Sequence, residues 1–152
     1  MKVKIQRIKQ KEEEQVVIEC VEITPEIREI YSYVLTKGTD LSGTENGRIC
    51  KFKLEDVCYF EAMEEKVFAY TMSRVFEMKM RLYEIEETYK SHYFIRCSKS
   101  MVLNLMQLEG ISPALNGRFF AHMKNGERII ISRQYVPGLK VAVMGKQKRE
   151  GD

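Results

Sequence analysis

Apolar and polar positions alternate in the first part of the chain. Val3 and Ile5 alternate with Lys2, Lys4 and Gln6, and a second apolar run, VVIECVEI, covers residues 16–23 after the charged residues 11–14. Period-two alternation on both sides of a polar turn is typical of a β-hairpin. The pattern therefore predicts two short strands at the N-terminus.

The next apolar residues recur at helical spacing. Residues 24–26 (Thr-Pro-Glu) supply an N-cap, a proline at the first helical position and an acid in the first turn. Apolar side chains follow at i, i+3, i+4, i+7 and i+8 from Ile27 to Leu35, and Gly38 is suited to end the helix. The first 38 residues thus predict a β-β-α segment.

Strand-like patterns dominate the rest of the chain. The polar, Gly-containing residues 39–47 indicate a linker or long loop, so we expect an N-terminal segment of residues 1–47. One helix is expected near residues 80–90, and Asn125-Gly126 predicts a two-residue hairpin turn. The expected strands cover residues 48–53, 56–61, 66–72, 74–79, two runs within 94–105, 106–112, 117–123 and 127–131.

Polar, donor-rich residues interrupt these strands at three places. The stretch FIRCSKSMVLNL (residues 94–105) places RCSKS between two apolar runs, where Gly, Asn, Asp or Pro would be usual. Basic and amide side chains at the ends of rigid strands can bond phosphates and base edges in DNA, although ordinary surface turns have the same composition. The interrupting residues are Arg96, Ser98, Lys99 and Ser100; Asn116, Arg118 and the Asn125-Gly126 turn; and Ser132, Arg133, Gln134 and Tyr135.

Charge separates the two halves of the chain. Residues 1–88 hold 14 Lys and Arg against 18 Asp and Glu, whereas residues 89–152 hold 11 against 4. Clustered cations favour a polyanionic partner because phosphates release counterions on binding, while a solvated surface explains the same count equally well. The last residues, 145–152, are expected to form a basic flexible tail.

Length and composition limit the class of protein. With 152 residues and 44% hydrophobic content, the chain suits one globular domain with a small appendage. It has no run of about 20 apolar residues and no apolar leader, so we expect a cytoplasmic protein. The four cysteines form no CxxC pair, which favours buried thiols over a zinc site or a disulfide framework.

Sequence motifs for catalysis are absent. There is no Gly-rich phosphate loop, GxSxG or HExxH pattern, and the carboxylate runs fall where turns and an exposed helix face are expected. Cys97 with His92 or His122 is the one nucleophile pair worth naming, and nothing nearby supplies an oxyanion hole. We expect neither an enzyme nor a cofactor, a metal or a small-molecule substrate. Redox control through Cys97 beside Lys99 remains an alternative role for that thiol.

The order of segments resembles the LytTR DNA-binding domain family of bacterial transcription regulators. The similarity covers roughly residues 48–144. Its most specific parts are Phe94–Asn104, which matches F-x-R-x-x-[KR]-S-x-x-V-N, and Asn125–Tyr135, which matches N-G-x-x-[IV]-x-[IV]-S-R-x-Y. Many relatives have His where this chain has Ser98, and most carry a receiver domain in place of the short segment 1–47.

The resemblance implies a fold, a mode of binding and a set of residues. It implies a mainly β, elongated LytTR-like fold of about ten strands in three small sheets, with short helices, that reads the DNA major groove through strand-end loops. Two protomers are expected on direct repeats of double-stranded DNA, and a membrane-protein partner encoded nearby is a further expectation. By motif position, Lys66, Lys99 and Arg133 read bases, and the residues for DNA-backbone contact or loop support are Arg96, Ser98, Ser100, Asn104, Arg118, Ser132, Gln134 and Tyr135.

A signalling module that mainly binds another protein is the alternative function. The β region would then be a scaffold, and the helix at residues 24–37 would be the docking face. The apolar stripe of that helix must be covered, either by its own hairpin or by a second subunit.

Overall fold

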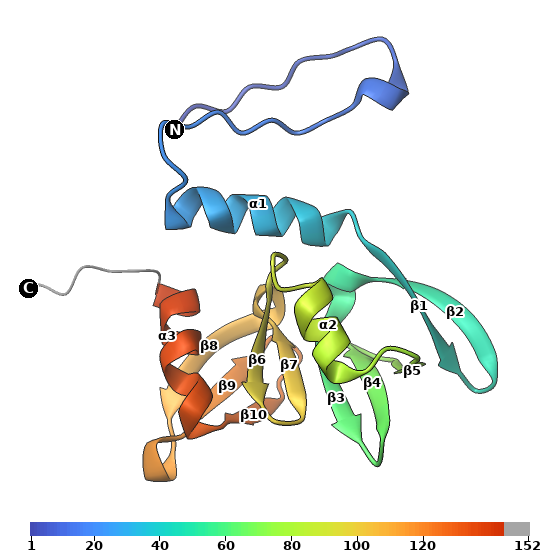
Figure 1. Ribbon diagram of the computed structural model, residues 1–152, viewed down its shortest axis with the longest axis vertical. Coiled ribbons are helices and arrows are strands. Elements are labelled where there is room, and N and C mark those ends of the chain that lie inside the picture. Colours follow the sequence, from blue (N-terminus) through green and yellow to red (C-terminus); the bar gives the residue numbers. More distant parts are fainter. Residues whose placement is uncertain (145–152) are drawn as a thin grey trace, which may run out of the picture.

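The computed structural model describes residues 1–144; the basic tail expected at residues 145–152 lies outside the described part. The described chain is mainly β, as expected, with ten strands, three α-helices and short 3-10 turns (Figure 1). The helices are α1 (Pro25–Lys37), α2 (Leu82–Thr88) and α3 (Val136–Met144). The strands are β1 (Asp40–Glu45), β2 (Arg48–Lys53), β3 (Val57–Met63), β4 (Lys66–Thr71), β5 (Val75–Met78), β6 (Phe94–Ser98), β7 (Met101–Asn104), β8 (Leu108–Pro113), β9 (Phe119–Met123) and β10 (Arg128–Ile131).

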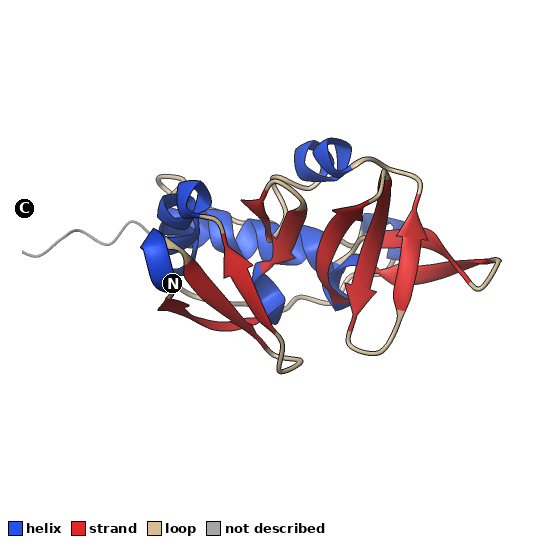
Figure 2. Ribbon diagram, turned by 90° about the horizontal axis from the view of Figure 1, so that it is seen from below, coloured by secondary structure: helices blue, strands red, loops and turns tan. Residues whose placement is uncertain are grey.

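The strands form two antiparallel sheets. Seven strands lie in the order β2-β1-β5-β4-β3-β7-β6, and three lie in the order β10-β9-β8. The resemblance implied three small sheets; two are found, because β1 and β2 extend the larger sheet through the pairing of Thr44 with Glu77. Figure 2, which views the molecule from below, shows the two groups of strands side by side with α1 behind them.

Two hydrophobic cores explain why the central strands are apolar on both faces. Alternate residues of a strand point to opposite sides of a sheet. Phe60 on β3 and Val102 on β7 belong to the core beneath α2, whereas their neighbours Tyr59 and Leu103 belong to the core shared with the three-stranded sheet and α3. The runs VCYF and MVLNL are therefore buried on both faces, which accounts for their continuous hydrophobicity.

Helix α1 begins and ends where the sequence indicates. Thr24 Oγ1 accepts a hydrogen bond from Ile27 N at 3.2 Å, and Gly38 follows the last helical residue. Buried Thr36 joins the helix to the β region, because its hydroxyl accepts from Tyr93 N at 2.9 Å and donates to Ser32 O at 2.8 Å. The helix is thus fixed to the body of the molecule by a buried polar contact.

Several local predictions were wrong. Residues 1–23 form no strands: they contain only a 3-10 turn at Lys11–Glu13, because no hydrogen-bonded ladder joins the two apolar runs. The expected loop at residues 39–47 contains strand β1, which pairs with β2 across Asn46-Gly47. Both turn residues have positive φ (51° and 78°), so this Asn-Gly pair forms a two-residue turn.

The Asn125-Gly126 hairpin has a different turn from the one expected. Met123 N donates to Glu127 O at 2.9 Å, so three residues lie between the paired positions. Gly126 has a φ of 89°, whereas Asn125 is not among the positive-φ residues. The side chain of Asn125 accepts from Glu127 N at 2.9 Å, which fixes this longer turn.

None of the helices described here has both the length and the apolar character needed to cross a membrane.

Candidate nucleic-acid interface

The β6–β7 turn presents Lys99 at its tip. Lys99 and Ser100 form the turn, and both are exposed. Ser98 Oγ accepts from Ser100 N at 3.2 Å, and the two serine hydroxyls are 3.4 Å apart. The hydroxyls therefore stabilise the turn itself, which answers why serines stand here in place of the usual turn residues.

Arg96 supports this turn from below. Its guanidinium donates to Ser98 O at 2.7 Å, to Lys99 O, and to Glu86 Oε1 at 2.9 Å. The side chain of Arg96 is only 18% exposed, so it is placed to shape the turn rather than to reach outward. Glu86 was not predicted as a site residue, because in the sequence it is one of several acids on the expected helix. Its partner, Arg96, lies ten residues further along the chain.

The β3–β4 hairpin lies beside the β6–β7 turn. Ala62 N donates to Ser100 O at 2.8 Å, which joins the two hairpins near their tips. Lys66 follows the Glu64-Glu65 turn, is exposed, and has its Nζ 3.7 Å from Glu77 Oε1. Lys66 is therefore near the other turns, but it is turned toward a carboxylate of β5.

Arg133 follows β10, and its segment lies beside β6, whereas the β3–β4 hairpin lies beside β7. Ser132 N donates to Cys97 O at 3.0 Å, which brings the start of the segment 133–135 next to β6. The aliphatic part of Arg133 lies against Gly117, where an added Cβ would be 2.9 Å from Arg133 Cδ. Gly117 has a φ of 75°, a backbone angle that favours glycine, and any side chain at this position would crowd Arg133.

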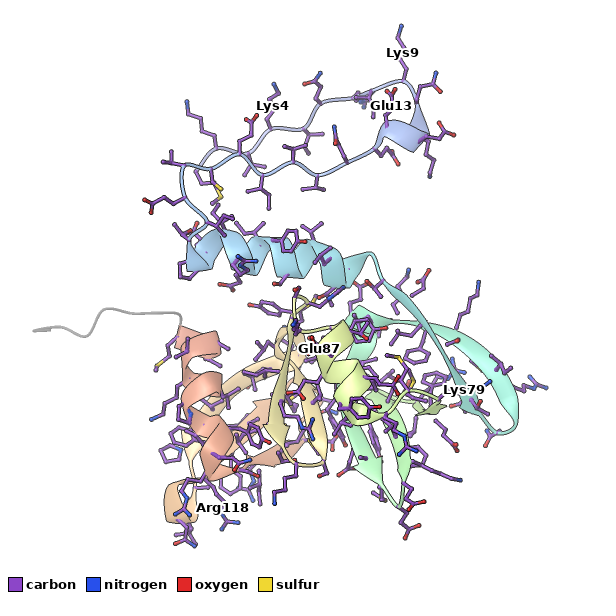
Figure 3. All side chains as sticks on the ribbon, viewed as in Figure 1. Lys4, Lys9, Glu13, Lys79, Glu87 and Arg118 are labelled. Carbon is purple, nitrogen blue, oxygen red and sulfur yellow. The ribbon has the colours of Figure 1, made fainter. Side chains whose placement is uncertain are left out.

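The loop that carries Gly117 also places Arg118. Arg118 Nε donates to Leu115 O at 3.1 Å, which ties the side chain to its own loop. Figure 3 shows Arg118 at the lower edge of the molecule, and Figure 1 places the β3–β4 and β6–β7 turns and the start of α3 along that same edge. The expected base-reading residues and Arg118 thus come from neighbouring loops on one edge.

The remaining predicted residues differ in exposure. Asn104 is fully buried: its amide donates to Val57 O at 2.7 Å and to Glu55 O at 3.2 Å, and its oxygen accepts from Met106 N at 2.9 Å. It supports the interior and cannot touch a phosphate from there. Gln134 is exposed, Ser132 is half-buried, and Tyr135 packs partly against the second core.

Cys97 lies inside the fold, behind the β6–β7 turn. Its side chain is fully buried, and burial raises the pKa of its thiol to about 12 despite the nearby Arg96. A reactive thiol needs access and thiolate character. The structure therefore argues against the alternative of redox control through Cys97.

A family model described as the LytTr DNA-binding domain matches residues 47–144. The chain belongs to the LytTR family. The match covers every strand from β2 onward together with α2 and α3, and it leaves residues 1–46 outside.

Similar proteins share this part of the chain. An uncharacterized HTH-type transcriptional regulator of Staphylococcus aureus (strain NCTC 8325 / PS 47) is 32% identical over 106 residues, which are 70% of this chain and 71% of that protein. The corresponding protein of strain MRSA252 is 31% identical over the same length. Among solved structures, a LytTr DNA-binding domain from Bacillus cereus has a TM-score of 0.65 at 24% identity and covers 69% of this chain and 96% of that one. This likeness supports the LytTR fold described above.

Proposed function

We propose that this protein is a transcription regulator that binds specific sequences in double-stranded DNA through the loops of its lower edge. The lower edge comprises the loops that carry Lys66, Lys99, Arg118 and Arg133. The observation that carries the proposal is the chain of backbone contacts that holds three loops side by side: Ala62 N to Ser100 O, and Ser132 N to Cys97 O. Family membership supports DNA as the partner, and the names of the relatives support a regulatory role. The protein acts by binding, without catalysis.

Lys99 and Arg133 are the residues we assign to base edges in the major groove. Both are exposed at loop ends, and both types of side chain donate to the acceptor groups of guanine. Lys66 is a third base-reading residue that must first leave Glu77; an exposed pair at 3.7 Å contributes little, so the loss is small. Arg118 and Gln134 are assigned to phosphates, and Arg96, Ser98, Ser100 and Asn104 to support of the loops.

Loop insertion fits this architecture better than insertion of a recognition helix. The three α-helices of the described residues are separated from one another by strands, so none follows another across a short turn. The relatives' names refer to the helix-turn-helix class, whereas here the exposed cations lie at the ends of strands: Lys66 at the start of β4, Lys99 in the β6–β7 turn and Arg133 after β10. Two protomers on direct repeats would place two such edges along one face of the duplex.

Fluorescence anisotropy with a duplex selected by genomic footprinting tests the proposal. Lys99→Ala and Arg133→Ala should each cost about 1 to 3 kcal/mol on the selected site and much less on unrelated DNA. Lys79→Ala is the matched control, because Lys79 is an exposed lysine that Figure 3 places away from the lower edge. Equal losses on all sequences would reduce these residues to phosphate contacts, and binding without sequence preference or salt dependence would refute the proposal.

A further inference from the structure

Residues 1–23 lie apart from the rest of the molecule. Figure 1 shows them as two extended arms that double back above α1. Within the described chain, no hydrogen bond joins these residues to residues 25–144, and the two arms are joined only by the backbone hydrogen bonds of the 3-10 turn between them, from Glu13 N to Gln10 O and from Glu14 N to Lys11 O. Val3, Ile5 and Val21 are 88%, 94% and 102% exposed, so these apolar side chains lack a partner within the chain.

The apolar stripe of α1 also points away from the body. Ser32 and Thr36 are the buried residues of this helix and mark the side that contacts the β region. Ile27, Ile30 and Val34 recur at i, i+3 and i+7, which places them about half a turn around the helix from that side. The stripe therefore faces the arms, where Val34 remains 37% exposed.

The two arms carry opposite charges. Residues 1–11 contain five Lys and Arg and no acid, whereas residues 12–22 contain five Glu and no base. No ion pair joins them within the described chain, although both lie above α1 in the view of Figure 1. Each chain thus offers one basic and one acidic strand-like arm, both with exposed apolar side chains.

We propose that residues 1–23 form a dimer interface with a second copy of this chain, in the absence of DNA. The basic arm of each copy pairs with the acidic arm of the other, and the apolar residues of both arms are buried between the copies and the α1 stripes. A two-fold interface requires a surface that is complementary to itself, and equal numbers of opposite charges on two arms of one chain meet this requirement. A partner with a different sequence could be matched by a segment whose charges all have the same sign.

The proposed interface lies away from the edge assigned to DNA (Figure 1). The arms continue into α1 through a single stretch of chain around Val21–Thr24, and the DNA-binding edge lies on the side of the molecule opposite to the arms (Figure 1). Dimerisation through the arms therefore leaves the lower edge free for DNA.

Sedimentation velocity of the full chain without DNA tests the interface by charge reversal. One variant changes every acid of residues 12–22 to Lys, and a second changes every base of residues 1–11 to Glu. The wild type should sediment as a dimer at micromolar concentration, and each variant alone should be monomeric because both of its arms then carry the same sign. An equimolar mixture of the two variants should recover the dimer.

Two further variants separate the apolar contribution from general effects. Ile5→Asp combined with Val17→Asp should give a monomer, whereas Ile49→Asp, at an exposed apolar position of β2, should leave the dimer intact. Far-ultraviolet circular dichroism should be unchanged in all of them, since the arms are not packed on the β region. A monomeric wild type, or dimers that persist in either charge-reversed variant alone, would overturn the proposal.

Discussion

Gly117 offers a sharp test of how the proposed DNA-binding edge is built. Its φ of 75° costs an L-residue about 1 to 2 kcal/mol, and an added Cβ would be 2.9 Å from Arg133 Cδ. Gly47 has nearly the same φ, 78°, but nothing lies within 4 Å of its Cβ position. Gly117→Ala and Gly47→Ala therefore share the backbone cost, and they differ in the contact with Arg133.

The two substitutions should separate stability from binding. Urea denaturation should show a loss of about 1 to 2 kcal/mol in the free energy of unfolding for both variants. DNA affinity, measured by anisotropy, should fall for Gly117→Ala alone, because the displaced Arg133 loses part of the roughly 1 to 3 kcal/mol that a base contact contributes.

A double-mutant cycle supplies the decisive measurement. If Gly117 acts through Arg133, then Gly117→Ala should cost no further affinity in a chain that already carries Arg133→Ala. Full additivity of the two losses, or an affinity of Gly117→Ala within twofold of the wild type, would refute the reasoning.

Four other predictions concern Thr36, Arg96 and Cys97. Thr36→Val leaves the backbone N–H of Tyr93 unpaired, so urea denaturation should show a loss of about 1 to 3 kcal/mol; an unchanged midpoint would mean that water replaces the hydroxyl. Arg96→Met should weaken DNA binding with an unchanged salt slope, because it shapes the β6–β7 turn; a slope reduced by about 1 would show a phosphate contact instead. Iodoacetamide should spare Cys97 in the native protein and modify it only when the chain unfolds, as mass spectrometry would show. Since burial raises the pKa of Cys97 to about 12, its contribution to stability is complete below the ordinary thiol pKa of about 8.5 and is lost as the pH rises toward 12; Cys97→Ala should flatten this alkaline decline in urea midpoints, and an unchanged slope would contradict it.

The strands that carry a strong apolar pattern could be predicted from the sequence. Strands β2 to β10 and helices α1 and α2 lie close to their expected positions, since burial on one or both faces gives each a recognisable period. Strand β1 was missed because DLSGTE is polar; it forms through pairing with β2 and through Gly43, whose missing side chain admits Phe76. Such a strand depends on its neighbours rather than on its own residues.

The prediction for the N-terminal arms was wrong in the opposite sense: strands were expected and none is found. Their alternation predicted strands, but residues 1–23 form none, because within one chain no hydrogen-bonded ladder joins the two arms and most of their apolar side chains are exposed. Helix α3 was missed because VPGLK contains Pro and Gly; its burial of Val136 and Leu139 in the second core outweighs this unfavourable local composition. Helix α3 thus shows a tertiary contact deciding what local sequence cannot.

The cations of the candidate site could be predicted from the sequence, but the residues that hold them in place could not. Lys99 and Arg133 stand out as polar interruptions, whereas the contacts of Arg96 with Glu86 and of Arg133 with Gly117 join residues far apart in the chain. No spacing rule relates such pairs.

The loops of the lower edge are tied together by main-chain atoms, through Ala62 N to Ser100 O and Ser132 N to Cys97 O. Side chains at the loop tips are therefore free to change without loosening the frame that aims them. A lineage could acquire a new operator by altering exposed residues such as Lys99 or Arg133 one at a time, while the spacing between its contact points along the duplex stays constant.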